Sequence, residues 1–461
     1  MKKILGLLVS VFLLLMASTS VKAISDPLAV PNNKVGIHIF SEKDLPEAAQ
    51  LVNTNGDWGY VTFVIAEGER DHDRWQKAFD QMRKLHLIPI VRIASKANGD
   101  VWEKPTEAEI NNWTAFLNSL NWVTQNRYVI ISNEPNHASE WGGTIDPSEY
   151  ATYLKTFYLK LKEASQDFYV LPAALDASAN NSASTMEESR FIKNMIKGEP
   201  DVLDFIDGWN SHAYPNPDFS GKETDKGKGS VDTFNWEINL LSSLGITKAL
   251  PIFITETGWS TANISEDAVA ARLDYSYRNV WNDKRIVAVT PFILNYPSPP
   301  FSQFSWKKSD GTFYKFFKTV ADSQKITGLP KQIVKGDIVA AFAQPIIPVG
   351  SEYIGAILAR NTGQSIWNFN NVSIGSDFID LPVSTLSFQD IEPTKLGLIV
   401  FKAASPENTG IYTRSLFLRD AKNERVTNSF PIEAYLVKLD KVQISSFFDT
   451  IRSYFRSILK I

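Results

Sequence analysis

Residues 128–136 read YVIISNEPN, a short apolar run that ends abruptly in polar residues at Asn133 and Glu134. The same form recurs in residues 252–259, which read IFITETGW, where the apolar run ends at Glu256. Short runs that are apolar at consecutive positions are typical of strands buried on both faces, as in a parallel sheet. Both stretches therefore predict a buried strand with a glutamate at its carboxyl end.

Six further runs of this kind surround these two. The eight predicted strands are residues 35–40, 60–65, 88–93, 128–132, 169–172, 206–211, 252–255 and 286–293. Helical patterns lie between them, including residues 71–85, a capping-box spacing from Thr106 to Glu109, and a helix that begins at Pro147. This alternation predicts an α/β fold, a (β/α)8 TIM barrel. An open doubly wound sheet is the alternative, but no Gly-rich phosphate loop follows the first strand.

The pattern changes after about residue 329. Residues 330–440 alternate apolar and polar positions between turns rich in Pro, Gly and Asn, as in residues 338–342 and 353–359. This predicts a smaller all-β sandwich domain after a barrel domain of residues 24–329. Residues 360–367, RNTGQSIW, resemble the Asn-Thr-Gly and Trp turn of some immunoglobulin-like accessory domains.

The two ends of the chain have patterns of their own. Residues 1–23 carry Lys2 and Lys3, an apolar run and small residues, which predicts an export signal and a secreted or cell-surface protein. An uncleaved membrane anchor stays open as the alternative. Residues 441–461 predict a basic amphipathic helix that either contacts a membrane surface peripherally or packs on its own protein.

Composition excludes several classes of function. The chain has 461 residues, 44% of them hydrophobic and 21% charged, which is typical of a globular protein. Its formal net charge is -4, and no basic cluster is interleaved with aromatic residues, so no nucleic-acid partner is expected. The absence of Cys excludes disulfides, thiolate nucleophiles and Cys-ligated metals.

The positions of Glu134 and Glu256 indicate a reaction class. The carboxyl ends of barrel strands converge on one pocket, so glutamates that end strands four and seven can face each other across it. Glycosidic cleavage needs two such carboxyl groups. One protonates the leaving oxygen, and the other attacks the anomeric carbon or, at a larger separation, activates a water.

Asn133-Glu134-Pro135, together with Glu256 after strand seven, resembles the catalytic signatures of glycoside hydrolase clan A. These are retaining (β/α)8 glycosidases, cellulase-like and similar to families 5 and 39, and the resemblance covers residues 35–329. It implies that Glu134 is the acid/base and Glu256 the nucleophile. It also implies an oligo- or polysaccharide substrate and no metal or cofactor.

The resemblance carries over to further positions. Asn133 is expected to bind the sugar 2-hydroxyl, and His212 and Tyr214 match the clan's His-x-Tyr after strand six, where the Tyr hydroxyl supports the nucleophile. Arg92 ends strand three and is expected to hold Glu256 ionised. The clan's Arg more often lies on strand two, so a structural salt bridge stays open for Arg92.

Substrate contacts are expected to be aromatic, because pyranose rings present flat C–H faces. Trp259, Trp306, Tyr296, Trp102 and Trp141 all follow predicted strands. Any one of them is more often a core residue than a substrate platform, but as a group they indicate a cleft. Trp259, Trp306 and Tyr296 are predicted substrate-binding residues, and Trp306 is the best single candidate.

The leading hypothesis is a retaining glycoside hydrolase that cleaves O-glycosidic bonds of a β-linked oligo- or polysaccharide. In this hypothesis the barrel catalyses and the sandwich assists. One alternative is a carbohydrate-binding barrel without turnover. The other is an envelope-glycan transglycosylase that uses the same two glutamates but transfers the sugar to another sugar.

Overall fold

A computed structural model describes residues 24–296, 298–377, 383–438 and 446. The chain divides into two compact units whose main boundary lies between Pro330 and Lys331. The short segment Asn121–Gln125 is grouped with the second unit. The predicted export signal lies outside the described residues, as does the predicted C-terminal helix apart from residue 446.

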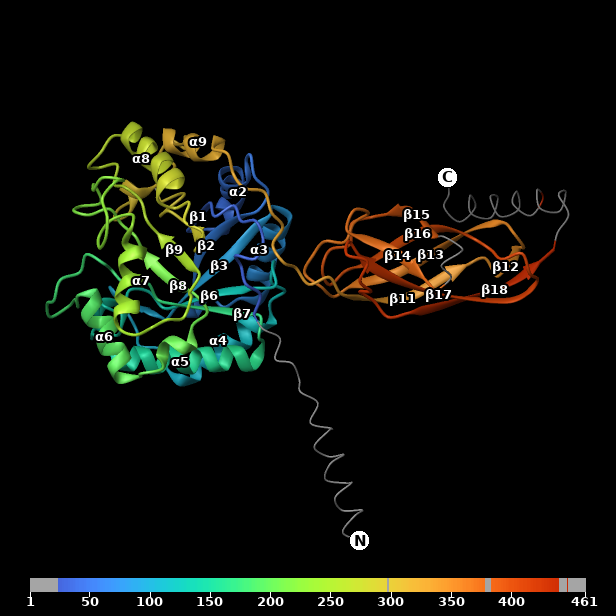
Figure 1. Ribbon diagram of the computed structural model, residues 1–461, viewed down its shortest axis with the longest axis horizontal. Helices are drawn as coiled ribbons and strands as arrows, with labels where there is room; N and C mark the ends of the chain where they lie inside the picture. Colours follow the sequence, from blue (N-terminus) through green and yellow to red (C-terminus); the bar gives the residue numbers. More distant parts are fainter. Residues whose placement is uncertain (1–23, 297, 378–382, 439–445, 447–461) are drawn as a thin grey trace, which may run out of the picture. The chain divides into compact units, whose positions relative to one another are not determined.

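The first unit contains eight parallel strands, each followed by an α-helix (Figure 1). The strands are β1 (Gly36–His38), β2 (Gly59–Ala66), β3 (Leu87–Ala94), β6 (Arg127–Ile131), β7 (Phe168–Pro172), β8 (Trp209–His212), β9 (Ile252–Glu256) and β10 (Ile286–Val289). The helices are α2 (Leu45–Asn53), α3 (His72–Lys84), α4 (Glu107–Ser119), α5 (Pro147–Ala164), α6 (Glu188–Gly198), α7 (Thr233–Ser243), α8 (Glu266–Asn279) and α9 (Lys315–Asp322).

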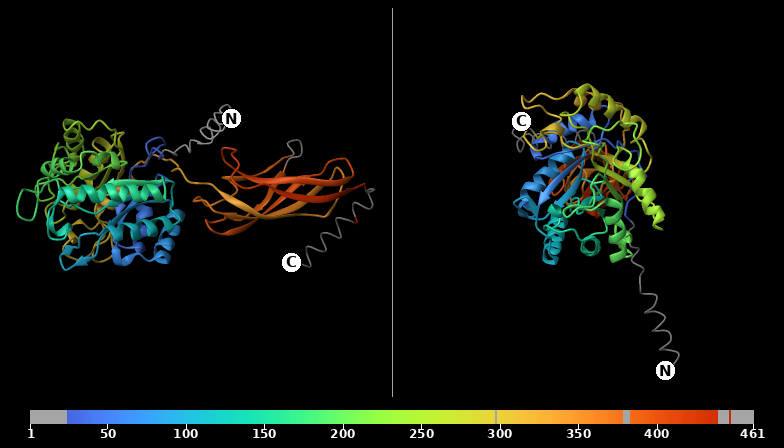
Figure 2. Two further views of the ribbon diagram at one scale, coloured as in Figure 1. Left: turned by 90° about the horizontal axis from the view of Figure 1, so that it is seen from below. Right: turned by 90° about the vertical axis from the view of Figure 1, so that its left-hand side faces the viewer.

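The strands close into a barrel. They form two parallel sheets in the orders β1-β2-β3-β6-β7 and β10-β9-β8. A parallel bridge between Val35 and Val289 joins β1 to β10, and one between Asp176 and His212 joins the segment after β7 to β8. The helices lie outside the strands (Figure 2). The predicted (β/α)8 barrel is therefore confirmed, with its strands in sequence order.

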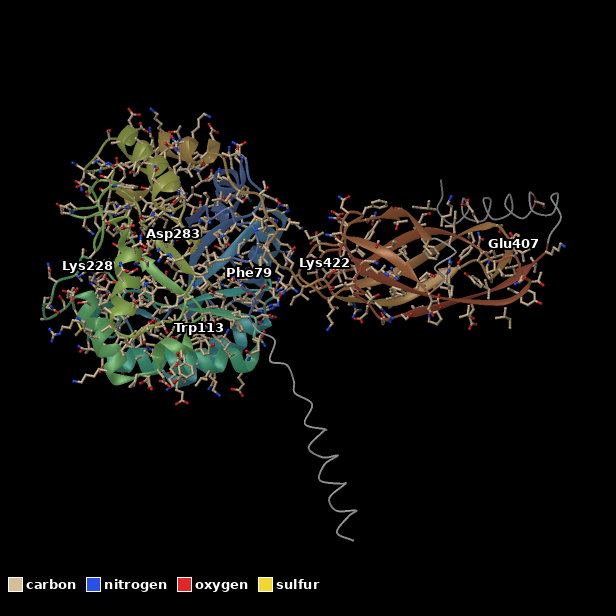
Figure 3. The ribbon with its side chains drawn as sticks, in the orientation of Figure 1. Phe79, Trp113, Lys228, Asp283, Glu407 and Lys422 are labelled. Carbon is tan, nitrogen blue, oxygen red and sulfur yellow. The ribbon has the colours of Figure 1, made fainter. Side chains whose placement is uncertain are left out.

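Local signals in the sequence begin the helices where they were predicted. The Asp71 carboxylate accepts from the Arg74 backbone N–H at 3.0 Å and begins α3, and Thr106 begins α4 in the same way. Pro147 is the first residue of α5. Packing then orients the helices: Phe79 of α3 and Trp113 of α4, labelled in Figure 3, are almost fully buried.

The last predicted strand, residues 286–293, is shorter in the structure. β10 ends at Val289, and Pro291 follows, which has no N–H to donate to a neighbouring strand. The chain turns at this point, so that the backbone N–H of Phe292 donates to the Thr257 carbonyl at 2.9 Å. This turn brings Phe292 to the carboxyl end of the barrel.

Short elements lie in the loops around the barrel. They are the strands β4 (Ala97–Asn98) and β5 (Val101–Trp102) and the 3-10 helices η1 (Glu42–Asp44), η2 (Glu67–Glu69), η3 (Ala138–Glu140), η4 (Val202–Phe205) and η5 (Ser302–Phe304). The loop that contains η3 follows β6 directly. This loop lies at the carboxyl end of the barrel, where its residues His137 and Glu140 line the pocket described below.

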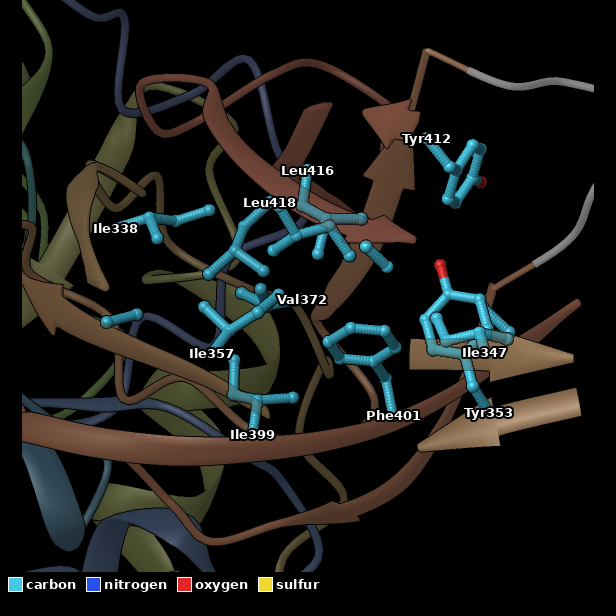
Figure 4. Packing of buried hydrophobic residues seen from close by; sticks show 14 of the residues in the cluster. Ile338, Ile347, Tyr353, Ile357, Val372, Ile399, Phe401, Tyr412, Leu416 and Leu418 are labelled. Atoms are coloured by element: carbon cyan, nitrogen blue, oxygen red, sulfur yellow. The ribbon is translucent and has the colours of Figure 1, made fainter. Parts of the chain in front are cut away.

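The second unit consists of two four-stranded sheets. Their orders are β11 (Gly336–Ala343), β13 (Glu352–Asn361), β16 (Leu396–Ala404), β15 (Val383–Phe388), and β12 (Ile346–Pro348), β18 (Phe430–Val437), β17 (Gly410–Asp420), β14 (Val372–Ser376). All pairs are antiparallel except β12 with β18. Residues from both sheets, among them Ile357, Ile399 and Leu418, form one buried core (Figure 4). The predicted β-sandwich is present.

No helix among the described residues has both the length and the hydropathy needed to span a bilayer.

Candidate active site

Glu134 and Glu256 lie at the carboxyl ends of barrel strands. Glu256 is the last residue of β9, and Glu134 comes three residues after the end of β6. The backbone between β6 and this glutamate is strained, because Ser132 has φ 71° and Glu134 has φ 28°, both in the left-handed region. Non-glycine residues in that region are uncommon and often mark functional sites.

Glu256 is surrounded by donors and positive charge. The Arg92 guanidinium donates from Nη1 to Oε1 of Glu256 at 2.5 Å, and the Tyr214 hydroxyl donates to Oε2 at 3.0 Å. Burial alone raises the pKa of Glu256, but the charges of His212 and Arg92 and the bond from Tyr214 outweigh it. The pKa of this carboxyl is therefore well below its ordinary value, and it is held ionised.

One imidazole contacts both glutamates. Nδ1 of His212 lies 2.7 Å from Oε1 of Glu134, and Nε2 of the same ring lies 3.9 Å from Oε1 of Glu256. Burial lowers the pKa of His212, but the negative charges of Glu256 and Glu134 outweigh it, so its pKa is raised. The two carboxyl groups thus face a common space beside one ring.

Arg92 also positions Asn133. Its Nη1 donates to Oδ1 of Asn133 at 2.7 Å, in addition to the contact with Glu256. Arg92 belongs to β3, the third barrel strand, and still reaches the glutamate at the end of the seventh. The carbonyl side of the Asn133 amide is thereby occupied, and the Asn133 side chain also bonds to the Glu140 carboxyl.

These residues line a cavity of about 360 Å³ at the carboxyl end of the barrel. Of the sequence-predicted site residues, six line it together: Arg92, Asn133, Glu134, His212, Tyr214 and Glu256. This volume is within the range of pockets that hold small ligands. The cavity is also where the active sites of characterised barrel enzymes lie.

Three predicted aromatic contacts are not part of the pocket lining. Trp259 is buried and donates from Nε1 to the Gly221 carbonyl at 2.8 Å. Trp306 is also buried and packs edge-on against Phe316. Tyr296 packs its ring against neighbouring phenylalanines. A large ring after a strand can be buried in the core as readily as it can face a ligand. Trp259 and Trp306 are buried, whereas Tyr296 is half-buried beside Phe301, which lines the pocket.

Two of the five aromatic residues that the sequence places after predicted strands, Trp102 of β5 and Trp141, do line the pocket. The aromatic rings that the sequence analysis did not name are Phe219, Phe292, Phe301 and Phe304. Phe219 packs edge-on against Tyr214 with 5.1 Å between ring centroids. These phenylalanines follow β8 and β10, so an apolar residue after the end of a barrel strand was the available signal.

Sequence reasoning also missed three ionisable residues of the lining, His137, Glu140 and Asp176. Glu140, at the end of η3, faces Arg92 and Asn133, and burial is the largest cause that raises its pKa to about 7. Nε2 of His137 lies 2.8 Å from Oδ2 of Asp176, and both residues line the pocket. The loop after β6 therefore supplies a third glutamate beside the two predicted ones.

No group of three or more His, Asp or Glu side chains within the described residues is arranged to hold a metal ion.

Of the comparisons with known proteins, only the one with solved structures finds proteins similar to this chain. No family model matches the chain, and no curated protein matches it. It is similar to a family 39 glycoside hydrolase from Bacteroides cellulosilyticus WH2, with 15% identity over 83% of this chain and 82% of that one and a TM-score of 0.46. It is also similar to an endo-beta-1,4-glucanase from Xanthomonas axonopodis pv. citri, with 13% identity, coverage of 63% and 98%, and a TM-score of 0.42. A third is GH5_18 from Streptomyces cattleya in complex with GlcNAc, with 10% identity, coverage of 70% and 86%, and a TM-score of 0.46.

These values describe distant likeness. The function of this chain is therefore argued from the geometry of its own pocket.

Proposed function

We propose that this chain is a retaining glycoside hydrolase that cleaves O-glycosidic bonds of a β-linked oligo- or polysaccharide. The observation that carries the proposal is the pair Glu134 and Glu256 at the ends of β6 and β9, both in contact with His212 in one pocket. Their environments differ, because of the two glutamates only Glu256 accepts hydrogen bonds from Arg92 and Tyr214. Two carboxyls with different surroundings are the requirement for acid and nucleophile roles.

In the first step the Glu256 carboxylate attacks the anomeric carbon. The bond from that carbon to the leaving oxygen breaks, and Glu134 transfers its proton to this oxygen. Nδ1 of His212 contacts Oε1 of Glu134, which leaves Oε2 to carry the transferred proton. Asn133, with its carbonyl held by Arg92, donates to the sugar 2-hydroxyl as positive charge develops in the ring.

In the second step water displaces Glu256 from the anomeric carbon. Glu134, now ionised, takes a proton from a water molecule while the water oxygen bonds to the anomeric carbon. The bond to Glu256 breaks, and the carboxylate returns to its place against Arg92 and Tyr214. Two inversions give net retention.

Kinetics on a panel of aryl β-glycosides, with the anomeric configuration of the products followed by proton NMR, test this proposal. The wild type is expected to release the β-anomer first. Azide is expected to restore activity to Glu134→Ala as a β-glycosyl azide and to Glu256→Ala as an α-glycosyl azide. Glu107→Ala, which changes an exposed glutamate of α4, serves as the matched control.

The other outcomes separate the remaining hypotheses. An inverted product, or full activity without either glutamate, contradicts the assigned roles. Binding without cleavage of any substrate on the panel favours a carbohydrate-binding barrel. Products longer than the substrate favour a transglycosylase that acts on envelope glycans.

We also propose that the protein acts outside the cytoplasm, secreted or at the cell surface. The support is the basic, apolar and small-residue pattern of residues 1–23. Sequencing the amino terminus of protein recovered from the culture medium and from the envelope tests this. A start at Ile24 supports cleavage, whereas retention of residues 1–23 in the membrane fraction supports an anchor.

A further inference from the structure

The two sides of the pocket differ in chemistry. The loops after β6 and β7 supply His137, Glu140, Asp176 and Ser178 to its lining, and we call these four residues the polar wall. The loops after β8 and β10 supply phenylalanine rings, which form no hydrogen bonds to a sugar hydroxyl. The two-step mechanism proposed above uses no residue of the polar wall.

The polar wall lies beside Glu134, the proposed acid. The His137 backbone N–H donates to the Glu134 carbonyl at 2.8 Å, and the Glu134 backbone N–H donates to the Ala174 carbonyl at 3.1 Å, two residues before Asp176. The bond to Asp176 raises the pKa of His137, and the negative charge of Glu134 adds to this against the effect of burial. The leaving oxygen has to come within hydrogen-bond reach of the Glu134 carboxyl, so the group that it carries lies along the polar wall.

Asp176 is fixed from several directions. Its Oδ1 accepts from the Ser178 backbone N–H at 2.7 Å and from the Ser178 hydroxyl at 2.6 Å. Its backbone N–H and carbonyl both bond to the side-chain amide of the buried residue Asn136. Burial raises the pKa of Asp176, but the bonds from His137 and Ser178 outweigh it and lower this pKa to about 2. The ionised Oδ2 then accepts from Nε2 of His137 at 2.8 Å and holds the ring.

The other nitrogen of the His137 ring is available to a ligand. Because an ionised carboxylate only accepts, Nε2 has to carry the proton of the bond to Asp176. Within the part of the chain that the structure describes, Nδ1 has no hydrogen-bond partner and is not among the buried polar atoms. Nδ1 accepts a hydrogen bond when the ring is neutral and donates one when it is charged, and a sugar hydroxyl can serve as partner in both cases.

An aromatic face lies on the same side of the pocket. The Gly142 backbone N–H, in the loop that contains η3, donates to the Trp102 carbonyl at 2.8 Å, which ties β5 to that loop. Trp102 is half-buried and lines the pocket, whereas Trp141 is buried and its Nε1 donates to Glu149. One accessible ring face together with hydrogen-bonding side chains matches a pyranose ring, which has apolar faces and polar edges.

We propose that His137, held by Asp176, binds a hydroxyl group of a sugar on the leaving side of the scissile bond. This inference rests on the proposed glycosidase function and narrows its substrate, because the leaving group is then itself a sugar and not an apolar alcohol. His137 is a substrate-binding residue in this arrangement. Asp176 is a positioning residue that acts through the His137 ring.

Substrates that share one sugar and differ in the leaving group test this inference. They are the aryl β-glycoside that the full chain cleaves best and a set of β-linked disaccharides and trisaccharides with the same sugar at the cleaved bond. His137→Phe keeps a ring and removes both nitrogens. It should lower kcat/KM on the best oligosaccharide by about 10- to 100-fold, because one hydrogen bond is lost, and on the aryl glycoside by no more than about threefold. Retained aryl activity shows that the variant is folded.

Two further variants and a control sharpen this experiment. His137→Gln keeps a hydrogen-bonding group, so its loss on the oligosaccharide should be smaller than that of His137→Phe. The control is His86→Gln, since His86 lies 2.7 Å from Asp57 in a similar pair, but directly before β3 at the amino end of the barrel. It should change kcat/KM on neither substrate.

Asp176→Asn tests the positioning role. It should lower kcat/KM on the oligosaccharide alone, and it should also lower the pKa of His137, because the carboxylate that raises this pKa is gone. NMR titration of the five histidine rings, with the His137 signal assigned from His137→Gln, measures this change. A purely structural role of Asp176 would not produce the shift.

The contrary outcomes are distinct. Equal losses on both kinds of substrate in His137→Phe and His137→Gln, or no loss on either, overturn the inference and leave the glycosidase function standing. Cleavage of the aryl glycoside but of no oligosaccharide by the wild type does the same. An unchanged pKa of His137 in Asp176→Asn overturns the positioning role of Asp176. A wild type that cleaves nothing contradicts the proposed function, and the inference fails with it.

Discussion

Two pairs of glutamates lie around β8, and their surroundings are opposite. Glu134 and Glu256 face the pocket and contact His212, the last residue of that strand. Glu188 of α6 and Glu237 of α7 are fully buried, and their carboxyl groups interact directly with each other. Alternate residues of a strand point to opposite sides, so one strand can serve both pairs.

The second pair has neutral donors in place of the guanidinium that Glu256 has. Trp209 donates from Nε1 to Oε2 of Glu237 at 3.0 Å, and the neutral hydroxyl of Ser211 also lowers the pKa of this carboxyl. Burial raises the pKa of Glu188 and of Glu237. The ammonium of Lys228, labelled in Figure 3, pairs with Glu187 instead.

The comparison teaches that burial alone does not decide the charge of a carboxyl group. Both Glu256 and Glu237 are buried, yet the pKa of the first is lowered and that of the second is raised. The difference lies in the charges near each carboxyl, because His212 and Arg92 lower the pKa of Glu256, and of these two glutamates only Glu256 pairs with Arg92. A buried glutamate therefore has a lowered pKa on one side of β8, where cations surround it, and a raised pKa on the other, where a second glutamate does.

The largest expected effect follows from removal of the ionised glutamate. Glu256→Ala should lower kcat on an aryl β-glycoside by about 10⁴-fold or more, because the covalent route is lost. Glu188→Gln, which changes the other pair, should keep kcat close to that of the wild type. The comparison fails if Glu256→Ala keeps kcat within tenfold or if Glu188→Gln loses it.

A smaller effect is expected when Arg92, the cation that pairs with Glu256, is replaced. Arg92→Met should lower kcat/KM by about 10²-fold at neutral pH, because the ionised nucleophile loses its charged partner. The pKa of Glu256 should rise, so activity, which falls as pH drops through that pKa, should be lost at a higher pH.

Profiles of kcat/KM between pH 3 and pH 8 measure this shift of the acid limb. Arg92→Lys keeps the charge without the planar donor and should retain an acid limb closer to that of the wild type. An acid limb that does not move in Arg92→Met would show that the guanidinium does not control ionisation of the nucleophile.

Substitution in the second pair, Glu188 and Glu237, should change the stability of the protein and not its kcat. The folded state keeps a proton on Glu188 and Glu237 that the unfolded chain releases near pH 4.3, so stability should fall as pH rises above that value. Glu188→Gln removes one raised pKa and should therefore raise the melting temperature at pH 8 by about 2 °C, and by less at pH 4.

Calorimetry at both pH values provides the measurement. Glu107→Gln, on the exposed side of α4, is the matched control and should change neither melting temperature. A loss of stability in Glu188→Gln that is the same at both pH values would indicate a packing defect and not a shared proton.

The smallest effect is expected from substitution of Glu140, the third glutamate of the pocket. Burial is the largest cause that raises its pKa to about 7, and the charges of Glu134 and Glu256 add to this, while Arg92 opposes it. Glu140→Gln should change kcat/KM by less than about tenfold and remove an inflection near pH 7 from its pH profile. Glu140→Asp keeps a titrating group and should retain an inflection.

The sequence by itself determined the architecture and the two glutamates. Strands buried on both faces must be apolar at consecutive positions, and the barrel places every carboxyl end at one mouth. Glu134 and Glu256 could therefore be assigned to one pocket from the position at which two apolar runs end. Arg92, Asn133, His212 and Tyr214 were predicted from the resemblance, and the structure brings them to the same pocket.

Only the tertiary structure decided how the loops complete that pocket. Phe219 and Glu140 come to its lining through the turns of their loops, whereas Trp259 and Trp306 turn into the core. An aromatic ring gains similar free energy from burial in either place, so its residue type cannot tell the two apart. Glu188 of α6 and Glu237 of α7 likewise meet only in the folded chain, a long-range contact that no local pattern records.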